Sequence, residues 1–372
     1  MGRVHTNLAT IRKARGVGAA ELANKIGVTR QTIYAIEAGS YVPNTEVTLK
    51  VARALEVSVE ELFSLPGERQ EETATVTAEY LGQSAAGKGQ AVRVCRVGTK
   101  WISVPVDARP YHLPEADAVV TSSSGRPAKT KLHLFSEEDT MRNKIVLAGC
   151  DPATSLLARM VERLSGIEII HAPASSQLAL DWLKDGKVHI AGSHLQDPKS
   201  SEFNMPFIRR QFPNRNMAVV TFARWEEGFV VASGNPKNIH SVEDLHRKNV
   251  TLMNRELGSG SRGLLDALIS SASLTAKGIR GYDHVAFGHL SAAHVVLSGE
   301  ADCCIATRSA AQTFGLDFVP LRNEQYDFVL HRETLKLAAV AALLDALQRA
   351  SLRRKLETLA GYDTSQTGIV RA

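Results

Sequence analysis

Short apolar runs alternate with segments of helical periodicity from Met141 to the end of the chain, and this alternation limits the fold more than any other feature. The apolar runs 145–149, 167–170 and 188–191 are each followed by a polar loop, and the first two loops each lead into a helical segment. Strands that alternate with helices are typical of α/β architectures. Residues 141–372 are therefore predicted to form an α/β domain.

A second set of these units follows a long extended stretch at 217–232. We expect a helix at 242–247, a strand at 250–253, a helix at 263–271, a helix at 292–298, a strand at 301–306, a helix at 309–314 and a return strand at 317–329. Two α/β lobes joined by long extended crossovers predict a hinged binding domain whose ligand lies in the cleft, where the polar loops converge.

The length of 372 residues exceeds what one core usually supports, so the chain is predicted to be multidomain. Residues 1–66 show the periodicity of short helices, and residues 67–140, rich in Val, Thr, Gly, Ser and Pro, predict a small β-rich connecting segment. Linkers are expected at 66–72 and 121–127. The middle segment has two open interpretations, a dimerisation unit or a connector.

Composition excludes several classes of protein. A net charge of +5 with 44% hydrophobic and 22% charged residues is typical of a globular chain. The first residues carry no secretion signal and no stretch approaches 18 apolar residues, so we expect a cytoplasmic protein outside the membrane. Four cysteines without CxxC or zinc-ligand spacing predict reduced buried thiols. His194, His289 and His294 have no second ligand at metal-site spacing and are predicted to be loop or surface histidines. No metal and no cofactor are therefore expected.

The amino-terminal segment contains a polar helix between two glycine turns. Gly27 ends a helix at 19–26, and Thr29 caps a helix at 30–37 that Gly39 closes. The start of the second helix is unusually polar, and Arg pairs with guanine and Gln with adenine through two hydrogen bonds each.

The run 21–63, ELANKIGVTRQTIYAIEAGSYVPNTEVTLKVARALEVSVEELF, resembles the Xre/Cro family of helix-turn-helix repressors. The resemblance implies a double-stranded DNA operator with helix 30–37 in the major groove. The residues that it implies as DNA contacts are Thr29, Arg30, Gln31, Thr32, Tyr34, Lys25 and Ser40. Because one such unit reads only a short half-site, it also implies a homodimer on a near-palindromic operator. Ala19 stands where the family often places Gln, so a phosphate contact is expected to be lost there.

Several loops of the α/β domain place serine or glycine at a helix start. Such a start offers a hydroxyl, free backbone N–H groups and partial positive charge, and two of them facing one another would bind a small anion. In GSGSR at 258–262, the glycines allow close approach of the backbone and the arginine adds charge. The residues predicted to bind the ligand are Asp151, Ser175, Ser176, His194, Arg255, Gly258, Ser259, Gly260, Ser261 and Arg262.

Residues 145–330 resemble the molybdate- or tungstate-binding-like domain related to periplasmic oxyanion-binding proteins, which bacteria fuse to helix-turn-helix regions. The runs that carry the resemblance include CDPATSLLA, GSHLQDPKSSEFN, EEGFVVASGNPKNI, NRELGSGSRGLLD and FGLDFVPLRNEQYDFVL. The resemblance implies a periplasmic-binding-protein-like fold and an oxyanion effector such as molybdate or tungstate. Cys150 in the first loop and Ser176-Gln177 in the second depart from the family's small-residue pattern, so another small anion or an organic metabolite stays an alternative.

These features together predict a one-component transcriptional regulator whose ligand closes the two lobes and changes operator affinity. The sign of that change stays open. The alternatives are a protein that stores or transfers an oxyanion, and an enzyme that uses the α/β domain. The sequence has no GxSxG, HExxH or paired-carboxylate motif, and Cys150 with His171 or His194 is its one thiol–imidazole option, so no catalysis is expected.

Overall fold

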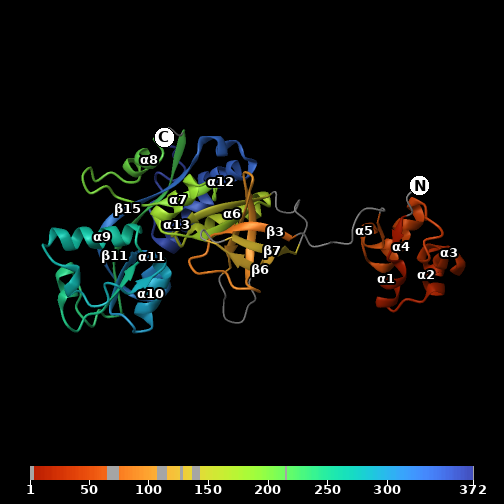
Figure 1. Ribbon diagram of the computed structural model, residues 1–372, viewed down its shortest axis with the longest axis horizontal. Helices are drawn as coiled ribbons and strands as arrows, with labels where there is room; N and C mark the ends of the chain where they lie inside the picture. The colour runs from red at the N-terminus through yellow and green to blue at the C-terminus, as the bar shows by residue number, and fades with distance from the viewer. Residues whose placement is uncertain are drawn as a thin grey trace. The chain divides into compact units, whose positions relative to one another are not determined.

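The computed structural model describes residues 4–64, 75–106, 115–125, 129–135, 143–213 and 216–371. The chain divides into two compact units, Met1–Glu72 and Thr73–Ala372 (Figure 1). In the described part of the first unit, five helices surround a small apolar core: α1 (Leu8–Ala14), α2 (Ala19–Ile26), α3 (Arg30–Glu37), α4 (Thr45–Leu55) and α5 (Val59–Leu62). The short strands β1 (His5–Thr6) and β2 (Phe63–Ser64) pair antiparallel beside them.

Local sequence explains the turn between α2 and α3. Gly27 has a φ of 79°, which only glycine adopts at no steric cost, and it ends α2 as predicted. Thr29 accepts a hydrogen bond from the amide of Thr32 and caps α3. Arg12 adds a contact that periodicity did not predict, because its guanidinium forms a buried ion pair with Glu37 at 2.6 Å between Nε and Oε1. This pair fixes α1 against α3.

The second unit begins with a closed barrel of five strands, in the order β3-β5-β4-β6-β7. Its strands are β3 (Thr75–Tyr80), β4 (Ala91–Val97), β5 (Lys100–Pro105), β6 (Ala118–Ser124) and β7 (Lys129–Leu134). The predicted β-rich middle segment is thus confirmed. The predicted linker at 121–127 was wrong for residues 121–124, which form the end of β6. Their exposed Thr and Ser side chains resemble a loop in composition. The predicted linker at 66–72 falls outside the described residues.

One mixed sheet of eight strands runs through the rest of this unit, in the order β13-β12-β14-β11-β15-β10-β8-β9. Its strands are β8 (Lys144–Gly149), β9 (Glu168–Pro173), β10 (Ile190–Ser193), β11 (Met217–Val231), β12 (Leu252–Arg255), β13 (Val285–Ala286), β14 (Cys303–Thr307) and β15 (Asp317–His331). The long strands β11 and β15 pair antiparallel and extend from one lobe into the other (Figure 1). The predicted two-lobed α/β architecture with extended crossovers is therefore confirmed.

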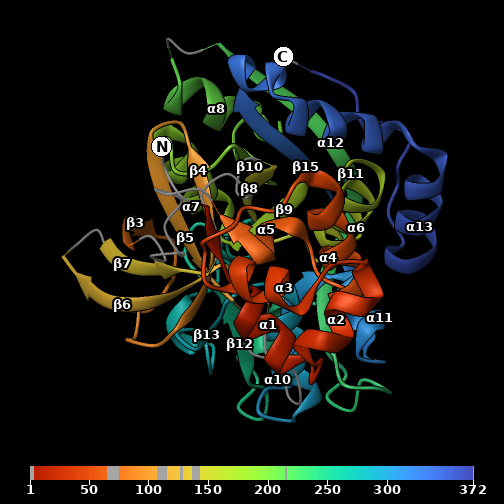
Figure 2. The same ribbon diagram turned by 90° about the vertical axis from the view of Figure 1, so that its right-hand side faces the viewer.

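The helices cover this sheet lobe by lobe. The first lobe contains β8, β9 and β10 with α6 (Thr154–Ser165), α7 (Ser176–Lys184), α8 (Met205–Gln211), α12 (Ala338–Gln348) and α13 (Ala350–Ala360). The second lobe contains β12, β13 and β14 with α9 (Gly260–Ser271), α10 (His289–Leu297) and α11 (Arg308–Thr313). Short 3-10 helices lie at Val242–His246, Ala276–Gly278 and Arg332–Lys336. Figure 2 shows α12 and α13 beside α6, with which they share the core of the first lobe.

Several predicted boundaries differ from the observed ones. The segment 242–247 is a 3-10 helix rather than an α-helix, and α9 begins at Gly260 instead of Gly263 because Ser259 caps it. The strand expected at 250–253 lies at Leu252–Arg255, where its carboxyl end carries polar side chains that alternation alone assigns to a loop. Helix α8 had not been predicted, because the preceding loop is polar and Pro206 sits in its first turn.

A charged cluster joins the barrel to the first lobe. Asp117 accepts hydrogen bonds from Nζ of Lys144 at 2.5 Å, from Nε of Arg93 at 3.1 Å and from the amide of Val94 at 2.7 Å. Burial alone would raise the pKa of Asp117, but these hydrogen bonds and the neighbouring positive charges lower it. Barrel side chains also share one apolar core with β8, β9 and α7. The barrel and the first lobe are thus one packed body.

We predict that Asp117→Asn lowers the free energy of unfolding of the second unit by about 1.5–3 kcal/mol at pH 7, the usual contribution of hydrogen bonds to a charged group. Because the folded-state pKa is lowered, the contribution is present above the ordinary pKa of about 3.9 and is lost as the pH falls through the folded value. Urea unfolding followed by tryptophan fluorescence measures it, since Trp101, Trp182 and Trp225 all lie in this unit. If the difference in the free energy of unfolding between Asp117→Asn and wild type is as large at pH 2 as at pH 7, this account is contradicted. The control is Glu162→Gln on the exposed face of α6.

Candidate functional site

The exposed start of α3 is the surface of the first unit that carries the predicted base-contacting side chains. Arg30 and Gln31 are exposed, and Tyr34 is 44% exposed. The guanidinium of Arg30 donates to the Tyr34 hydroxyl at 2.7 Å and lies 5.2 Å from the centre of its ring. Ile33 and Ile36 on the opposite face are buried. The helix thus presents polar side chains outward from a fixed apolar base.

The other predicted DNA contacts already bond to their own chain. Thr29 and Thr32 bond to one another at 2.8 Å between their hydroxyl oxygens, as part of the α3 cap. Lys25 donates to the carbonyl of Ala54 at 3.2 Å, and Ser40 donates to the carbonyl of Ala35 at 3.0 Å. Thr29 and Thr32 thus belong to the start of α3 and Ser40 follows its end, whereas Lys25 links α2 to α4.

In the second unit, the two lobes contact one another where the loop before α9 approaches the first lobe. The amide of Gln177, at the start of α7, donates to the carbonyl of Gly258 at 3.1 Å. A Cβ added to Gly260 would lie 2.4 Å from Nδ1 of His194. The glycines of GSGSR therefore allow the second lobe to approach the first, in addition to the approach to a ligand that the sequence suggested.

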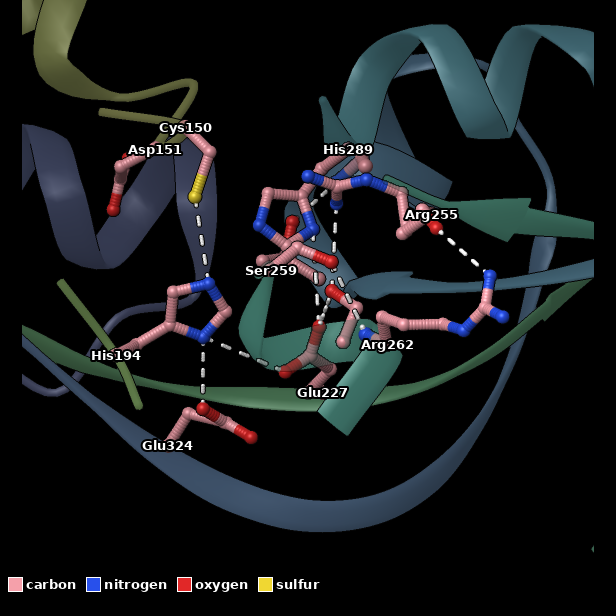
Figure 3. Close-up of polar contacts among 12 residues, drawn as sticks. Cys150, Asp151, His194, Glu227, Arg255, Ser259, Arg262, His289 and Glu324 are labelled. Carbon is pink, nitrogen blue, oxygen red and sulfur yellow. Dashed lines mark hydrogen bonds and ion pairs between the residues drawn. The ribbon is translucent and has the colours of Figure 1, made fainter. Parts of the chain in front are cut away.

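Behind this contact, a chamber of buried polar side chains lies across both lobes (Figure 3). We use "chamber" for Cys150, His194, Glu227, His289 and Glu324, all of which are at least 90% buried. Nε2 of His194 lies 3.4 Å from Sγ of Cys150, and Nδ1 lies 2.8 Å from a carboxylate oxygen of Glu324. Cys150 and His194 follow strands of the first lobe, His289 begins α10 in the second, and the two glutamates lie on the crossover strands.

The pKa values of the two glutamates of the chamber shift in opposite directions. Burial and the negative charge of Glu324 raise the pKa of Glu227 to about 8. Burial would also raise the pKa of Glu324, but its hydrogen bond to His194 and the positive charges of His194 and Arg322 lower it. Burial and the positive charges of Arg255 and His194 hold the pKa of His289 well below its ordinary value. His289 is therefore a neutral imidazole in a site that already holds carboxylates.

Several polar atoms of the chamber have no hydrogen-bond partner among the described residues. They are both ring nitrogens of His289 and Oε2 of Glu227. A buried polar group left without a hydrogen bond costs about 1–3 kcal/mol. The chamber therefore offers donor and acceptor atoms to something other than the protein itself.

The predicted ligand residues surround this chamber, and most of their polar atoms are engaged. Ser176 accepts the amide of His194 at 3.1 Å, and Ser261 donates to Glu227. Arg255 makes a two-point ion pair with Glu256, at 2.9 and 3.0 Å. Nε of Arg262 lies 3.4 Å from Asp266, and its guanidinium lies 4.1 Å from the centre of the Tyr282 ring.

The remaining predicted ligand residues make hydrogen bonds within the loops, where two of them cap helices. Ser175 caps α7, and Ser259 caps α9. Asp151 lies ahead of α6, which starts at Thr154 with Ala153 at its cap, and its carboxylate accepts a hydrogen bond from the amide of Ala153 at 2.6 Å. Burial raises the pKa of Asp151 to about 7.

A cavity of about 740 Å³ leads to the chamber from outside. Its walls come from the barrel and from both lobes, and they include Arg93, Cys150, Asp151, Glu256 and His289. Cys150 and His289 are thus reached from solvent on one side and contact the buried groups on the other.

Sequence reasoning missed Glu227 and Glu324 and set His289 aside as a loop or surface histidine. No local motif marks them, because each comes from a different element and they meet only when β11, β15 and α10 assemble. One signal was present: an acidic residue within each apolar crossover strand is costly to bury without a purpose.

Comparison with known proteins agrees with this architecture. The family model described as PBP superfamily domain matches residues 157–348, and a model described as Helix-turn-helix matches residues 8–62. The uncharacterized protein YvgK of Bacillus subtilis is 31% identical over 229 residues, which cover 62% of this chain and 74% of that protein. The uncharacterized HTH-type transcriptional regulator YgzD of the same organism is 40% identical over 58 residues, 16% of this chain and 88% of that protein.

Among solved structures, a putative phosphate ABC transporter substrate-binding protein with bound phosphate from Clostridium perfringens is similar, with a TM-score of 0.46 and 13% identity over 59% of this chain and 98% of that one. Within the described residues, no helix is both long enough and apolar enough to cross a membrane.

We predict that Gly260→Ala separates the two lobes at their contact, because the added methyl group overlaps the buried ring of His194. The amide of Gln177, which bonds across the contact, should then exchange its hydrogen at least about tenfold faster. Hydrogen exchange with mass spectrometry of the α7 peptide measures this. Gly263→Ala is the matched control on the same helix, since its Cβ would meet no atom within 4 Å among the described residues. Equal exchange in the two variants would contradict the contact.

Proposed function

This chain belongs to the PBP superfamily domain family and is a DNA-binding helix-turn-helix regulator, and from this we propose that a small ligand bound between its lobes controls its affinity for an operator. The observation that carries the proposal is the chamber, in which His289 and Glu227 hold polar atoms without a hydrogen-bond partner in the described chain. We further propose that the protein acts in the cytoplasm as a homodimer and that it is a sensor rather than an enzyme.

The coupling follows from where the chamber residues come from. Cys150 and His194 belong to the first lobe and His289 to the second, so a ligand that contacts both lobes binds the closed arrangement more tightly than an open one. A ligand without such a difference in affinity could not change DNA binding. A protein that only stores or transfers an oxyanion would not need a DNA-binding surface. The exposed start of α3 provides such a surface, and it therefore favours the regulator over this alternative.

The oxyanion expected from the sequence remains the first ligand to test. An ion such as molybdate or tungstate would use the amides at the start of α9 and the guanidinium of Arg262. The described contacts support it weakly, because Arg255 pairs with Glu256, Arg262 lies against Asp266, and two glutamates face the chamber. Titration calorimetry of the full chain with molybdate, tungstate, sulfate and phosphate tests whether an oxyanion binds. Binding that Arg262→Ala weakens would support the oxyanion, and no heat with any of the four would exclude it.

We predict that Arg30→Ala and Gln31→Ala each weaken binding to a cognate operator by about 1–3 kcal/mol and relax the preference at one base position. The operator is obtained by selecting tight-binding sequences from random duplexes, and fluorescence anisotropy at fixed salt gives the affinity. Lys50→Ala is the control for charge, because it removes one positive charge from α4, where Lys50 pairs with Glu46. If both α3 variants bind the operator like wild type, α3 is not the recognition helix.

The proposed homodimer sets the form of the operator. Two copies of α3 would read two half-sites separated by about one helical turn, roughly 34–36 Å, on a near-palindromic sequence. Sedimentation of the protein alone and with operator measures the number of chains bound. We expect two chains per operator, and a single chain at saturating protein would contradict the proposal.

A further inference from the structure

Three soft or nitrogen donors converge within the chamber. One ligand atom each from Cys150, His194 and His289 lies within 4.8 Å of the other two, and all three side chains are buried. In Figure 3 the sulfur of Cys150 and the ring of His289 both face the ring of His194. The three residues follow β8, follow β10 and begin α10, so the fold rather than a sequence motif brings them together.

The orientation of His194 suits a metal ligand. Its Nδ1 lies 2.8 Å from a carboxylate oxygen of Glu324, and its Nε2 lies 3.4 Å from Sγ of Cys150. A cation that displaces the proton from Nε2 would meet this nitrogen and the sulfur side by side, because metal ligands bind in their deprotonated form. A histidine that binds a metal usually donates its other ring N–H to a carboxylate in this way. Sulfur and nitrogen bound to one tetrahedral zinc, at about 2.3 and 2.05 Å, would lie about 3.5 Å apart. The observed separation thus needs little adjustment.

His289 provides the second, independent observation. It is 1% exposed, and neither ring nitrogen has a hydrogen-bond partner among the described residues. The nearest carboxylate oxygen, on Glu227, lies 3.9 Å from Nδ1. An imidazole that is buried with neither ring nitrogen hydrogen-bonded, and that faces a thiol and a second imidazole, can offer a ring nitrogen to a cation. Glu227, whose Oε2 also has no hydrogen-bond partner in the described chain, adds a carboxyl oxygen beside it.

The charges and donor types select a class of ligand. The carboxylate of Glu324 beside His194 repels an anion, and the two arginines nearby are already paired with Glu256 and Asp266. Thiolate and imidazole donors favour Zn²⁺, Cu and Ni ions over Mg²⁺ and Ca²⁺, which prefer oxygen ligands alone. The cavity that reaches Cys150 and His289 provides a path of entry.

We propose that the chamber binds one divalent transition-metal cation through Sγ of Cys150, Nε2 of His194 and a ring nitrogen of His289, with Glu227 beside it. This inference rests on the proposed function, because the cation is then the ligand that the regulator senses. The cation draws its ligands from both lobes, so it binds only when Gly260 and His194 are in contact. Glu324 acts as a positioning residue that holds the His194 ring.

The test is metal binding by the full-length protein after chelator treatment under reducing conditions. We titrate Co²⁺ and follow its sulfur-to-cobalt charge-transfer absorption in the near ultraviolet, and we measure Zn²⁺ affinity by competition with a chelating dye. We expect one Co²⁺ per chain with this absorption. Cys150→Ser should abolish the absorption, His289→Ala should weaken Zn²⁺ binding at least about 100-fold, and Glu324→Gln should weaken it about 10–100-fold, as loss of an outer-shell partner does.

Matched controls separate the site from the fold. Cys304→Ser removes a buried thiol on β14, and His294→Ala removes an exposed imidazole on the same helix as His289. Both should bind Co²⁺ and Zn²⁺ like wild type. Near-ultraviolet circular dichroism establishes that each variant is folded, and His289→Gln replaces His289→Ala if the latter unfolds.

The outcomes also separate this inference from the proposed function. Absence of the charge-transfer absorption in wild type, or its persistence in Cys150→Ser, overturns the metal site. If an oxyanion binds instead and shifts operator affinity, the metal inference fails while the regulator stands. If no metal binds and Cys150 is alkylated rapidly by iodoacetamide, the Cys150–His194–Glu324 arrangement is a reactive thiol and the metal inference is again overturned. If Zn²⁺ binds with one equivalent but never changes operator affinity, the metal site stands while sensing by this cation fails.

Discussion

The close approach of Gly260 to the ring of His194 is the contact on which the second unit's function depends. A side chain at position 260 would meet the ring within 2.5 Å, so only glycine lets the two lobes come this close. His194 at this contact is buried, and so are the thiol of Cys150 and the carboxylate of Glu324 that it faces. A ligand that contacts chamber residues of both lobes therefore opposes the separation of the lobes. The closed and open arrangements would then differ in their affinity for that ligand.

The free-energy cost of burying the polar side chains of the chamber indicates that they have a role other than stabilising the fold. Five buried titratable side chains meet in the chamber, and burial lowers the stability of every charged form that no partner compensates. Glu324 and His194 compensate one another, whereas His289 keeps two ring nitrogens without a hydrogen bond to any described residue. A protein selected for stability alone would place apolar side chains there, as it does in the neighbouring cores around Phe222 and Phe229.

Much of the fold could be predicted from the sequence, and the site only in part. Gly27 and Thr29 fix the turn before α3 locally, so that helix and its caps follow from neighbouring residues. The lobes and the crossover strands follow from periodicity over long segments. The pairing of β6 with β7 does not, because residues 121–124 at the end of β6 are all exposed and have the composition of a loop. The GSGSR loop was placed at the cleft from its position after a strand, but the partner of Ser261 is Glu227 on β11, a tertiary contact that spacing does not encode.

The account rests on the claim that occupancy of the chamber changes DNA binding through lobe closure. The most direct measurement is the operator affinity of the full-length protein with and without one equivalent of Zn²⁺, for wild type and for Gly260→Ala. The account predicts that Zn²⁺ shifts the operator Kd of wild type at least about tenfold, equivalent to about 1.4 kcal/mol of coupling. Zn²⁺ should not shift the operator Kd of Gly260→Ala. Without metal, the operator Kd values of the two proteins should differ by less than about tenfold. An equal shift in both proteins, or none in a wild-type protein that has bound its metal, would contradict it.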